Sequence, residues 1–302
     1  MVGQVKVSIC IVTYNQEQYI AECLQSVVDQ VADFSFEVVV SDDASSDRTP
    51  EIIRDFSLKY PGLFKVFLHE KNLGAGDNFV FAHQQARGEY IAHLDGDDYC
   101  LPGKLQAQAD YLDQNPRCNI VWHKMLVELP DGSLLGHSQV PDSMRGAAGY
   151  VYDMEFDRGA IIQFIAVGAN SSKMYRKNVR EYEVADFDTL DYFANVEQVG
   201  DGVGCFACDS PLGVYRAGVG VSSGSSKTRL LLCKTFLYFA SKYPQYRSQV
   251  NTAALTYLLV DLKNCRGTWW DFFKVYLRTF HPLSVVRFYR GMNVIRQLRL
   301  GK

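Results

Sequence analysis

Short apolar runs alternate with amphipathic stretches along the first 120 residues of the chain. The runs are rich in residues that favour strands, and they lie at 5–12, 36–40, 64–68 and 90–94. Apolar residues at helical spacing predict helices after each run, over 19–28, 49–60, 79–86 and 105–112. Repeated strand–helix units with short connections predict an α/β fold, with a mostly parallel sheet and helices on both faces. Thr49 is the expected N-cap of the second helix, with Pro50 in its first turn.

Beyond Asn119 the pattern is weaker. A further strand is expected over 120–127, and a turn at Pro130-Asp131-Gly132. Residues 133–160 are Gly-rich with little periodicity, which suggests a segment that is mobile or that covers a substrate. Another strand ends at Gly213–Arg216, and from Lys227 onward the chain becomes helical, basic and aromatic.

Composition places the chain among ordinary globular proteins. Of its 302 residues 47% are apolar and 22% charged, which excludes collagen-like and disordered classes. No run reaches the ~18–20 apolar residues of a membrane span, and the first apolar stretch is too short for an export signal. We therefore expect a cytoplasmic protein with reduced cysteines. Cys205 and Cys208 form one C-x-x-C, but no second pair stands at zinc spacing, so two core thiols are the simpler interpretation.

The formal charge of −3 conceals an uneven distribution. Residues 263–302 contain nine lysines and arginines against one acid, Asp271, whereas the body of the chain is acidic. An acidic body disfavours nucleic acid as a partner. Basic residues interleaved with Trp and Phe favour contact of 265–302 with an anionic membrane surface. The alternative is that the aromatic side chains pack on the rest of the protein.

Polar residues follow each of the four predicted strands. They are Thr13-Tyr14-Asn15, Ser41-Asp42-Asp43, Asn72-Leu73-Gly74 and Asp95-Gly96-Asp97-Asp98. Ligands of open α/β sheets bind at the carboxyl ends of the strands. Neither G-x-G-x-x-G in a strand–helix context nor a P-loop is present to hold phosphates. Three carboxylates in four residues, Asp95, Asp97 and Asp98, instead predict a Mg²⁺ or Mn²⁺ ion that neutralises the phosphates of a nucleotide.

These motifs resemble those of the family 2 glycosyltransferases, which have the GT-A fold. The matching stretches occur in order over roughly residues 5–125: SICIVTYN at 8–15, FEVVVSDDASSDRT at 36–49, KNLG at 71–74, GEYIAHLDGDDY at 88–99 and PGKLQ at 102–106. Val12 and Ala44 stand where many members have Pro and Gly. The resemblance implies a glycosyltransferase domain at 1–225, with a nucleotide-binding half at 1–125 and an acceptor half at 126–225, and the composition adds a helical, basic and aromatic C-terminal extension at 226–302.

The resemblance also implies roles for the donor-binding residues. Thr13 and Asn15 would line the nucleotide pocket, with Tyr14 and Asn72 as neighbours in it. Asp42 and Asp43 would meet the base and ribose.

Asp95 and Asp97 correspond to the D-x-D motif, with Asp97 the direct metal ligand on the diphosphate and Asp98 in support. Arg216 could bind the leaving diphosphate, since guanidinium groups clamp phosphate, or it could form a strand-end salt bridge.

For the catalytic base, the resemblance favours Asp186, with Asp188 and Asp191 as alternatives. Asp186 could also cap the helix that carries Leu190 and Phe193. Among the histidines, His93 and His123 lie in predicted strands and are expected in the core. His69 is the histidine nearest the expected site.

The expected activity is metal-dependent, inverting transfer of a hexosyl or N-acetylhexosaminyl group from a nucleotide-sugar, preferably a UDP-sugar, to a hydroxyl acceptor. A lipid-linked or growing surface glycan would suit a protein at the inner face of the cell membrane. One alternative is a non-catalytic nucleotide- or glycan-binding module. Another is a sugar-phosphate nucleotidyltransferase, although the Gly-rich basic loop which that class uses is absent from 13–20.

Overall fold

The computed structural model describes residues 4–136, 155–165, 167–177, 185–219 and 225–291. Its strands are β1 (Val7–Thr13), β2 (Phe36–Asp42), β3 (Phe64–Leu68), β4 (Tyr90–Asp95), β5 (Tyr99–Cys100), β6 (Cys118–Glu128), β7 (Leu134–Leu135), β8 (Met174–Arg176) and β9 (Val203–Arg216). Its α-helices are α1 (Ile20–Val28), α2 (Thr49–Lys59), α3 (Ala75–Gln84), α4 (Lys104–Gln114), α5 (Arg158–Phe164), α6 (Asp191–Gln198), α7 (Ser226–Lys242), α8 (Arg247–Lys263) and α9 (Trp269–Arg278). The 3₁₀ turns are η3 (Asn170–Ser172) and η4 (Pro244–Tyr246). The four strands and four helices predicted for the first 120 residues are confirmed.

All the strands belong to one sheet with the order β3-β2-β1-β4-β8-β6-β9-β5, and β7 pairs with β6. Strands β3, β2, β1 and β4 are mutually parallel. Strand β8 is antiparallel to both β4 and β6, which makes β6 and its parallel neighbour β9 run in the same direction as β4. The carboxyl ends of β1, β2, β4, β6 and β9 therefore lie at one edge of the sheet.

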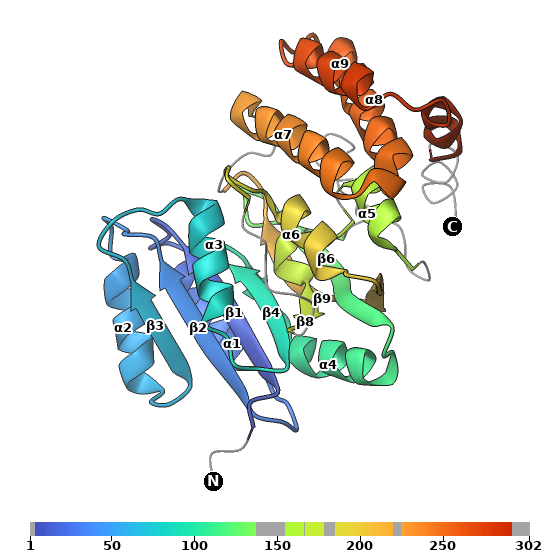
Figure 1. Cartoon of the computed structure of the whole chain (residues 1–302). Helices are drawn as coiled ribbons and strands as arrows, with labels where there is room; N and C mark the ends of the chain where they lie inside the picture. The colour runs from blue at the N-terminus through green and yellow to red at the C-terminus, as the bar shows by residue number, and fades with distance from the viewer. Residues whose placement is uncertain (1–3, 137–154, 166, 178–184, 220–224, 292–302) are drawn as a thin grey trace.

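Helices cover both faces of the sheet, as predicted (Figure 1). Strand β1 is buried along almost its whole length, and its side chains alternate between two apolar clusters. One cluster joins Ile9 and Ile11 to the inner sides of α1, α2 and α4. The other joins Cys10 to α3 and to helices α5 to α9. Burial on both faces explains why these strands read as continuous apolar runs in the sequence.

Helix α2 begins differently from the prediction. Thr49 is the first residue inside the helix rather than its cap, and Arg48 holds the N-cap position without a side-chain hydrogen bond. The Asp47 carboxylate accepts a hydrogen bond from Thr49 N at 3.0 Å. The prediction that Thr49 is the N-cap was wrong, because the Asp47 carboxylate, two residues upstream, accepts from the Thr49 backbone N–H and Thr49 itself lies in the helix.

The C-terminal helices α7, α8 and α9 gather at one end of the molecule, beyond α5 and α6 (Figure 1). Phe236, Phe239 and Phe272 lie in the same apolar cluster as Tyr192 and Phe193 of α6. Phe236 and Phe239 of α7 contact Tyr192 of α6, whereas Phe272, the member of this group that lies within 265–302, contacts Phe236 of α7 and Tyr257 of α8. The proposed boundary at 225/226 coincides with the start of α7, where Ser225 caps the helix by accepting from Thr228 N.

In the part of the chain that the structure describes, no helix is both long enough and apolar enough to cross a membrane. Most of the Gly-rich segment 133–160 lies outside the described residues. The prediction that it covers a substrate stays a prediction.

Candidate active site

The register of the sheet brings the predicted site residues to one edge. Thr13 at the end of β1 is level with Asp42 at the end of β2. Val12 is level with Asp95 at the end of β4. The polar residues that follow the predicted strands therefore lie close together, as the sequence indicated, because the parallel strands end side by side.

The loops after β1 and β2 are bound to each other. Asn15 has a left-handed backbone (φ 52°) and donates from its backbone N to Ser45 Oγ at 2.8 Å. Its side-chain oxygen accepts from Ser46 N at 2.8 Å. Asn15 and Tyr14 are exposed, whereas Thr13 is buried. These hydrogen bonds hold the two loops together as one rim at the edge of the sheet. This rim is where the nucleotide is expected to bind.

The acidic pair after β2 is buried and organises the neighbouring loops. Asp42 accepts from Ser45 N at 2.9 Å, and burial raises the pKa of its carboxyl group. Asp43 accepts from Leu73 N at 2.6 Å and from Gly74 N at 3.0 Å. Asn72 Nδ2 donates to the Asp43 carbonyl at 3.0 Å. Asp43 and Asn72 therefore hold together the loop that leads into α3.

The loop that follows β4 contains the D-x-D sequence and spans residues 95–98 (the D-x-D loop). It lies against β1 and β9. Gly96 N donates to the Val12 carbonyl at 2.9 Å, and Asp98 N donates to the Asp95 carbonyl at 3.0 Å. The Asp98 carboxylate accepts from Arg216 N at 3.0 Å. Asp97 and Asp98 are buried, and Asp95 is partly buried.

The three carboxylates differ in their electrostatic surroundings. Burial, followed by repulsion from Asp95, raises the pKa of Asp97 to about 6. Burial, followed by repulsion from Asp95 and Asp97, raises the pKa of Asp98 well above its ordinary value. Burial also acts to raise the pKa of Asp95, but His93, Ser171 and Lys173 together outweigh it and lower that pKa. Asp95 is thus the carboxylate most readily ionised, and its charge disfavours charge on the other two.

Arg216 links the end of β9 to this loop. Its guanidinium donates to the Asp97 carbonyl at 2.7 Å, lies 3.2 Å from Glu128, and pairs with Glu22. The ring of Tyr99 lies 4.7 Å from the guanidinium carbon. These contacts match the salt-bridge alternative for Arg216, and its contact with a diphosphate stays a prediction.

The residues of the loop fit a divalent cation that is shared with a ligand. No lysine or arginine among the described residues forms an ion pair with Asp95, Asp97 or Asp98 through their carboxylates. Within the same residues, no group of three His, Cys, Asp or Glu side chains is arranged to hold a metal alone. Mg²⁺ typically takes one or two carboxylates together with substrate phosphates. Thr13 Oγ1 and Gln16 Oε1 are buried beside Gly96 without a hydrogen-bond partner in the described structure, so polar atoms remain for a ligand.

The segment that carries Asp186 lies at the same edge. A Cβ on Gly76, in the first turn of α3, would come within 3.3 Å of the Thr189 carbonyl. Asp186 is exposed, and Asp188 lies 3.5 Å from Lys227. Asp191 is the first residue of α6, whose N-cap is Leu190. The alternative that Asp186 caps this helix is therefore wrong, because the helix starts five residues later.

Sequence reasoning overlooked the role of His93. His69 Nε2 lies 3.0 Å from Ser41 Oγ, close to the site as expected. His93 and His123 are buried, also as expected, but His93 Nε2 lies 3.1 Å from Asp95 Oδ1. The signal was available in the spacing, because residues two apart on a strand face the same side of the sheet.

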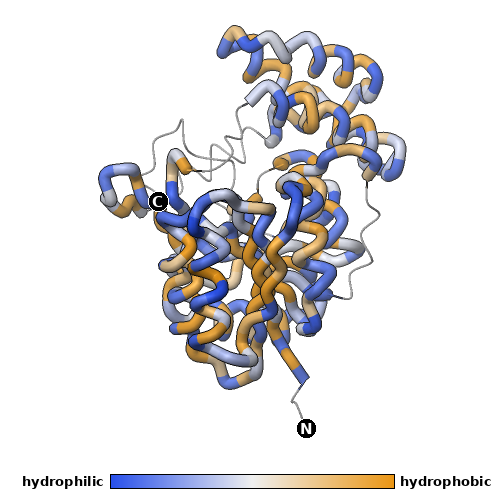
Figure 2. Tube along the Cα trace, turned by 90° about the vertical axis from the view of Figure 1, so that its left-hand side faces the viewer, coloured by the Kyte–Doolittle hydropathy of each residue, from blue (hydrophilic) through white to orange (hydrophobic). Residues whose placement is uncertain are grey.

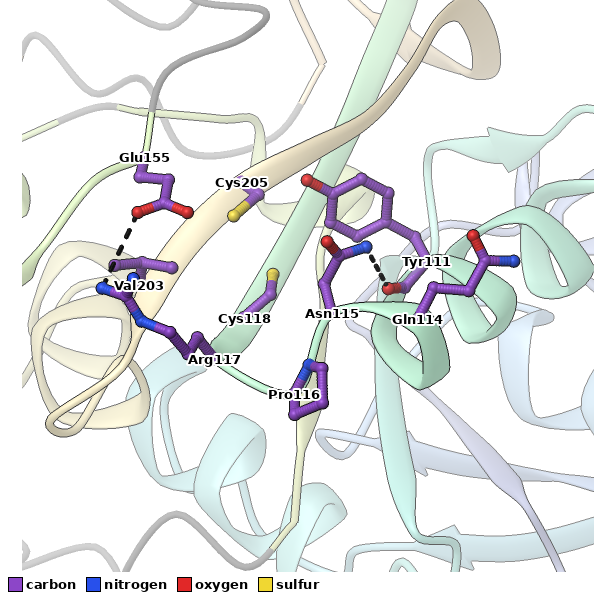
Figure 3. Close-up of a pocket in the computed structure, with 9 residues that line it drawn as sticks. All are labelled: Tyr111, Gln114, Asn115, Pro116, Arg117, Cys118, Glu155, Val203 and Cys205. Carbon is purple, nitrogen blue, oxygen red and sulfur yellow. Dashed lines mark hydrogen bonds and ion pairs between the residues drawn. The ribbon is translucent and has the colours of Figure 1, made fainter.

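A hollow opens at the opposite edge of the sheet, at the amino ends of β6 and β9 (Figure 3). Arg117 and Glu155 form an ion pair across it at 3.8 Å. Cys118 and Cys205 are buried free thiols in its wall. Cys205 is thus a core thiol, while the side chain of Cys208 lies outside the described residues. The hollow is separate from the D-x-D loop.

Comparison with known proteins supports the motif assignment. Residues 8–139 match the model of glycosyl transferase family 2. A Mycobacterium tuberculosis protein, Rv1520, is 42% identical over 127 residues, which are 42% of this chain and 37% of that protein. An uncharacterised glycosyltransferase of Methanocaldococcus jannaschii, MJ1057, is 33% identical over 141 residues, covering 45% and 48%. The chain therefore spans less than half the length of these relatives.

Solved structures share the fold over nearly the whole chain. Staphylococcus aureus TarS residues 1–349, in complex with UDP-GlcNAc, superimpose with a TM-score of 0.63 at 20% identity, covering 98% of this chain and 90% of that one. The full TarS structure matches 82% of this chain and 43% of its own, with a TM-score of 0.59. At this identity the likeness establishes the fold. The protein has a GT-A fold with a C-terminal helical extension, and its residues 8–139 match the model of glycosyl transferase family 2.

Proposed function

We propose that the protein is a metal-dependent inverting glycosyltransferase that uses a nucleotide-sugar, preferably a UDP-sugar. The observation that carries the proposal is Asp97, a buried carboxylate at the convergence of the strand ends, without a lysine or arginine partner among the described residues. Such a group is costly unless a cation joins it. TarS, which shares the fold, has been solved with UDP and with UDP-GlcNAc. These structures support a UDP-sugar donor here.

Asp97 and Asp95 would hold Mn²⁺ or Mg²⁺, with Asp98 in support. The ion, when bound, supplies Lewis-acid stabilisation of the departing diphosphate. Thr13, Tyr14 and Asn15 would contact the nucleotide, on the rim that the loops after β1 and β2 form. Asp42, Asp43 and Asn72 would shape the pocket for base and ribose through the loop that they hold.

Asp186 would act as the general base. Its carboxylate takes the proton of the acceptor hydroxyl while that oxygen attacks the anomeric carbon. The bond from this carbon to the diphosphate oxygen breaks, and the nucleoside diphosphate leaves on the opposite side, which inverts the configuration. The exposure of Asp186 is consistent with access by an acceptor. A proton transfer of this kind contributes about 10²–10⁴-fold in rate.

The acceptor that we propose is a glycan, lipid-linked or growing at the surface, on a protein held peripherally at the inner face of the cell membrane. Among the C-terminal helices, α9 exposes Trp269 and Trp270 together with Lys274 and Arg278, and Phe280 is exposed just beyond the end of α9. Hydrophilic and hydrophobic residues are interspersed along these helices (Figure 2). Exposed aromatic and basic side chains together favour an anionic lipid surface.

The test is release of free UDP from a panel of UDP-sugars, with Mn²⁺ or Mg²⁺ and then with chelator, in the presence of a membrane-lipid acceptor. Asp97→Asn is expected to abolish metal-dependent UDP binding and release. Asp186→Asn is expected to retain binding and lose at least ~100-fold in turnover. Asp188→Asn tests the alternative base beside Lys227 and is expected to keep near wild-type turnover; a loss in Asp188→Asn but not in Asp186→Asn would assign the base to Asp188.

Other outcomes separate the alternatives. Nucleotide binding without turnover by the wild type would indicate a binding module. Unchanged turnover in Asp186→Asn would remove the proposed base. Release of pyrophosphate from a nucleoside triphosphate and a sugar phosphate would indicate a nucleotidyltransferase.

A further inference from the structure

A continuous line of buried polar groups leads to the first carboxylate of the D-x-D motif. His93 Nε2 lies 3.1 Å from Asp95 Oδ1, and His93 Nδ1 lies 2.9 Å from His83 Nε2. His83 Nδ1 lies 2.7 Å from the hydroxyl of Tyr175. The four residues come from β4, α3 and β8, and both histidines are almost fully buried.

Hydrogen-bond chemistry gives this line a direction. An ionised Asp95 can only accept, so His93 must donate from Nε2. A neutral imidazole carries one N–H, so His93 Nδ1 accepts from His83 Nε2, and His83 Nδ1 accepts from the Tyr175 hydroxyl. Both rings are buried among apolar and aromatic side chains, which favours the neutral imidazole forms. Every donor in the line therefore points toward Asp95.

The surroundings hold the line in place. The ring of Phe79 stacks on His83 with 3.9 Å between centroids and lies 4.9 Å from the ring of His93. On the other carboxylate oxygen, Ser171 Oγ donates to Asp95 Oδ2 at 3.1 Å. Each oxygen of Asp95 thus has a fixed donor, so the side chain has one orientation at the end of β4.

We propose that His93 and His83, together with Tyr175, are positioning residues that fix the Asp95 carboxylate for the metal–nucleotide complex. The proposal rests on the function proposed above. Partners of metal-binding carboxylates are typically worth 10–100-fold in metal affinity, because they set the orientation and the charge of the ligand. Asp95 would act as the pre-oriented member of the motif, and Asp97 as the member that the cation completes.

The first experiment needs neither metal nor turnover. Long-range ¹H–¹⁵N spectra of the metal-free protein, labelled in its histidines, report which ring nitrogen carries the proton. We expect neutral Nε2–H forms for both His83 and His93 at pH 7. In Asp95→Asn, the signals of His93 should shift, while those of His123, a buried histidine outside the line, should not. An Nδ1–H form of His93 in the wild type would overturn the proposal.

The second experiment measures binding of UDP with Mn²⁺ by calorimetry. His93→Phe is expected to weaken binding by at least ~10-fold. His93→Gln, whose amide nitrogen can take the place of Nε2, should recover most of that loss. His123→Gln is the control and should bind as the wild type does. In an Asp95→Asn background, His93→Phe should have no further effect, because its action passes through Asp95.

Failure of this proposal can be told from failure of the proposed function. If the wild type shows no metal-dependent UDP binding, the function fails, while the spectra still decide the hydrogen-bond line. If the wild type binds and His93→Phe binds equally well, the positioning role is wrong. Should His93→Phe fail to fold, Tyr175→Phe removes a single hydroxyl and is expected to weaken binding several-fold, and wild-type binding by it would overturn the proposal.

Discussion

Gly96 packs directly against Thr13. A Cβ on residue 96 would lie 2.9 Å from Thr13 Cβ and 3.0 Å from Thr13 Oγ1, and it would also meet the side chain of Gln16. Only glycine therefore allows the D-x-D loop to approach the end of β1 so closely. This approach places the carboxylates of the loop beside the predicted nucleotide rim.

Gly96→Ala is expected to push the loop away from Thr13. Overpacking of this kind typically costs about 1–3 kcal/mol in the free energy of unfolding. The free energy of UDP binding should fall by more than the free energy of unfolding, because the displacement of the loop is local to the site. Gly267→Ala is the matched control, since a Cβ there meets nothing within 4 Å. Calorimetric UDP binding equal to wild type in Gly96→Ala would contradict the expectation.

Asp97→Asn should stabilise the metal-free protein while removing its function. Burial and Asp95 raise the pKa of the Asp97 carboxyl group to about 6, so its charge at pH 7 opposes folding. Removing that charge is expected to raise the free energy of unfolding by on the order of 2 kcal/mol at pH 7. The gain should shrink as the pH falls from about 6 to about 4 and vanish below that, where the carboxyl group is protonated in both folded and unfolded states.

Denaturant unfolding at several pH values measures this effect. Asp55→Asn, on the exposed side of α2, is the control for the loss of one negative charge. If Asp97→Asn were no more stable than Asp55→Asn at pH 7, Asp97 would not carry an uncompensated buried charge.

Lys173 gives the protein a second pH dependence. Its side chain is fully buried, donates to Asn195 Oδ1 at 3.2 Å, and lies 4.8 Å from the centre of the Phe79 ring. Burial lowers its pKa from 10.5 to about 8, although Asp191 and Asp95 act in the other direction. Between these two pH values the unfolded chain binds a proton that the folded protein does not, so stability rises with pH.

The rise is on the order of 3 kcal/mol between pH 7.5 and 10.5. Lys173→Met should remove it, and Lys59→Met, at an exposed position of α2, should keep it. Unfolding curves at matched pH values give the comparison. A rise of equal size in Lys173→Met would show that another group causes it.

Local patterns in the sequence were enough to predict the N-terminal sheet and the convergence of its strand ends. Buried parallel strands are recognisable in the sequence as apolar runs. The polar residues that follow them must meet at one edge of the sheet, because the strands run in the same direction. The GT-A fold followed from the order and spacing of these motifs. The cap of α2 was missed because Thr49 and Asp47 are both good acceptors, and which one is used depends on loop geometry.

Contacts between residues distant in the chain could not be predicted in this way. Arg216 pairs with Glu22, a residue 194 positions earlier, and no local pattern signals that pairing. His83 and His93 meet because α3 packs on β1 and β2, beside β4, and they reach Tyr175 through the insertion of β8 into the sheet. The packing of Phe236 and Phe239 against α6 likewise depends on where α7 lies relative to the body.

The exposed aromatic and basic residues of the C-terminal helices can be tested against vesicles. Trp269 is 37% exposed to solvent and Trp270 is 47% exposed, whereas Phe272 and Val275 on the same helix are buried. Helix α9 therefore has an inner apolar face that packs and an outer face that does not. Replacing Lys274 and Arg278 with Gln should weaken cosedimentation with anionic vesicles by about 2 kcal/mol, roughly 30-fold, at ~1 kcal/mol per basic residue. Trp270→Ser should weaken it further by reducing the apolar area that enters the interface.

The controls separate membrane binding from general charge effects. Lys59→Gln removes one positive charge from the distant helix α2 and should leave cosedimentation near wild type, and vesicles of neutral lipid should bind all the proteins weakly. Equal binding of wild type, the Lys274/Arg278 double variant and Trp270→Ser to anionic vesicles would show that this face is not the contact. Binding that is lost only with Trp270→Ser would mean that apolar insertion, rather than attraction to anionic headgroups, holds the protein at the surface.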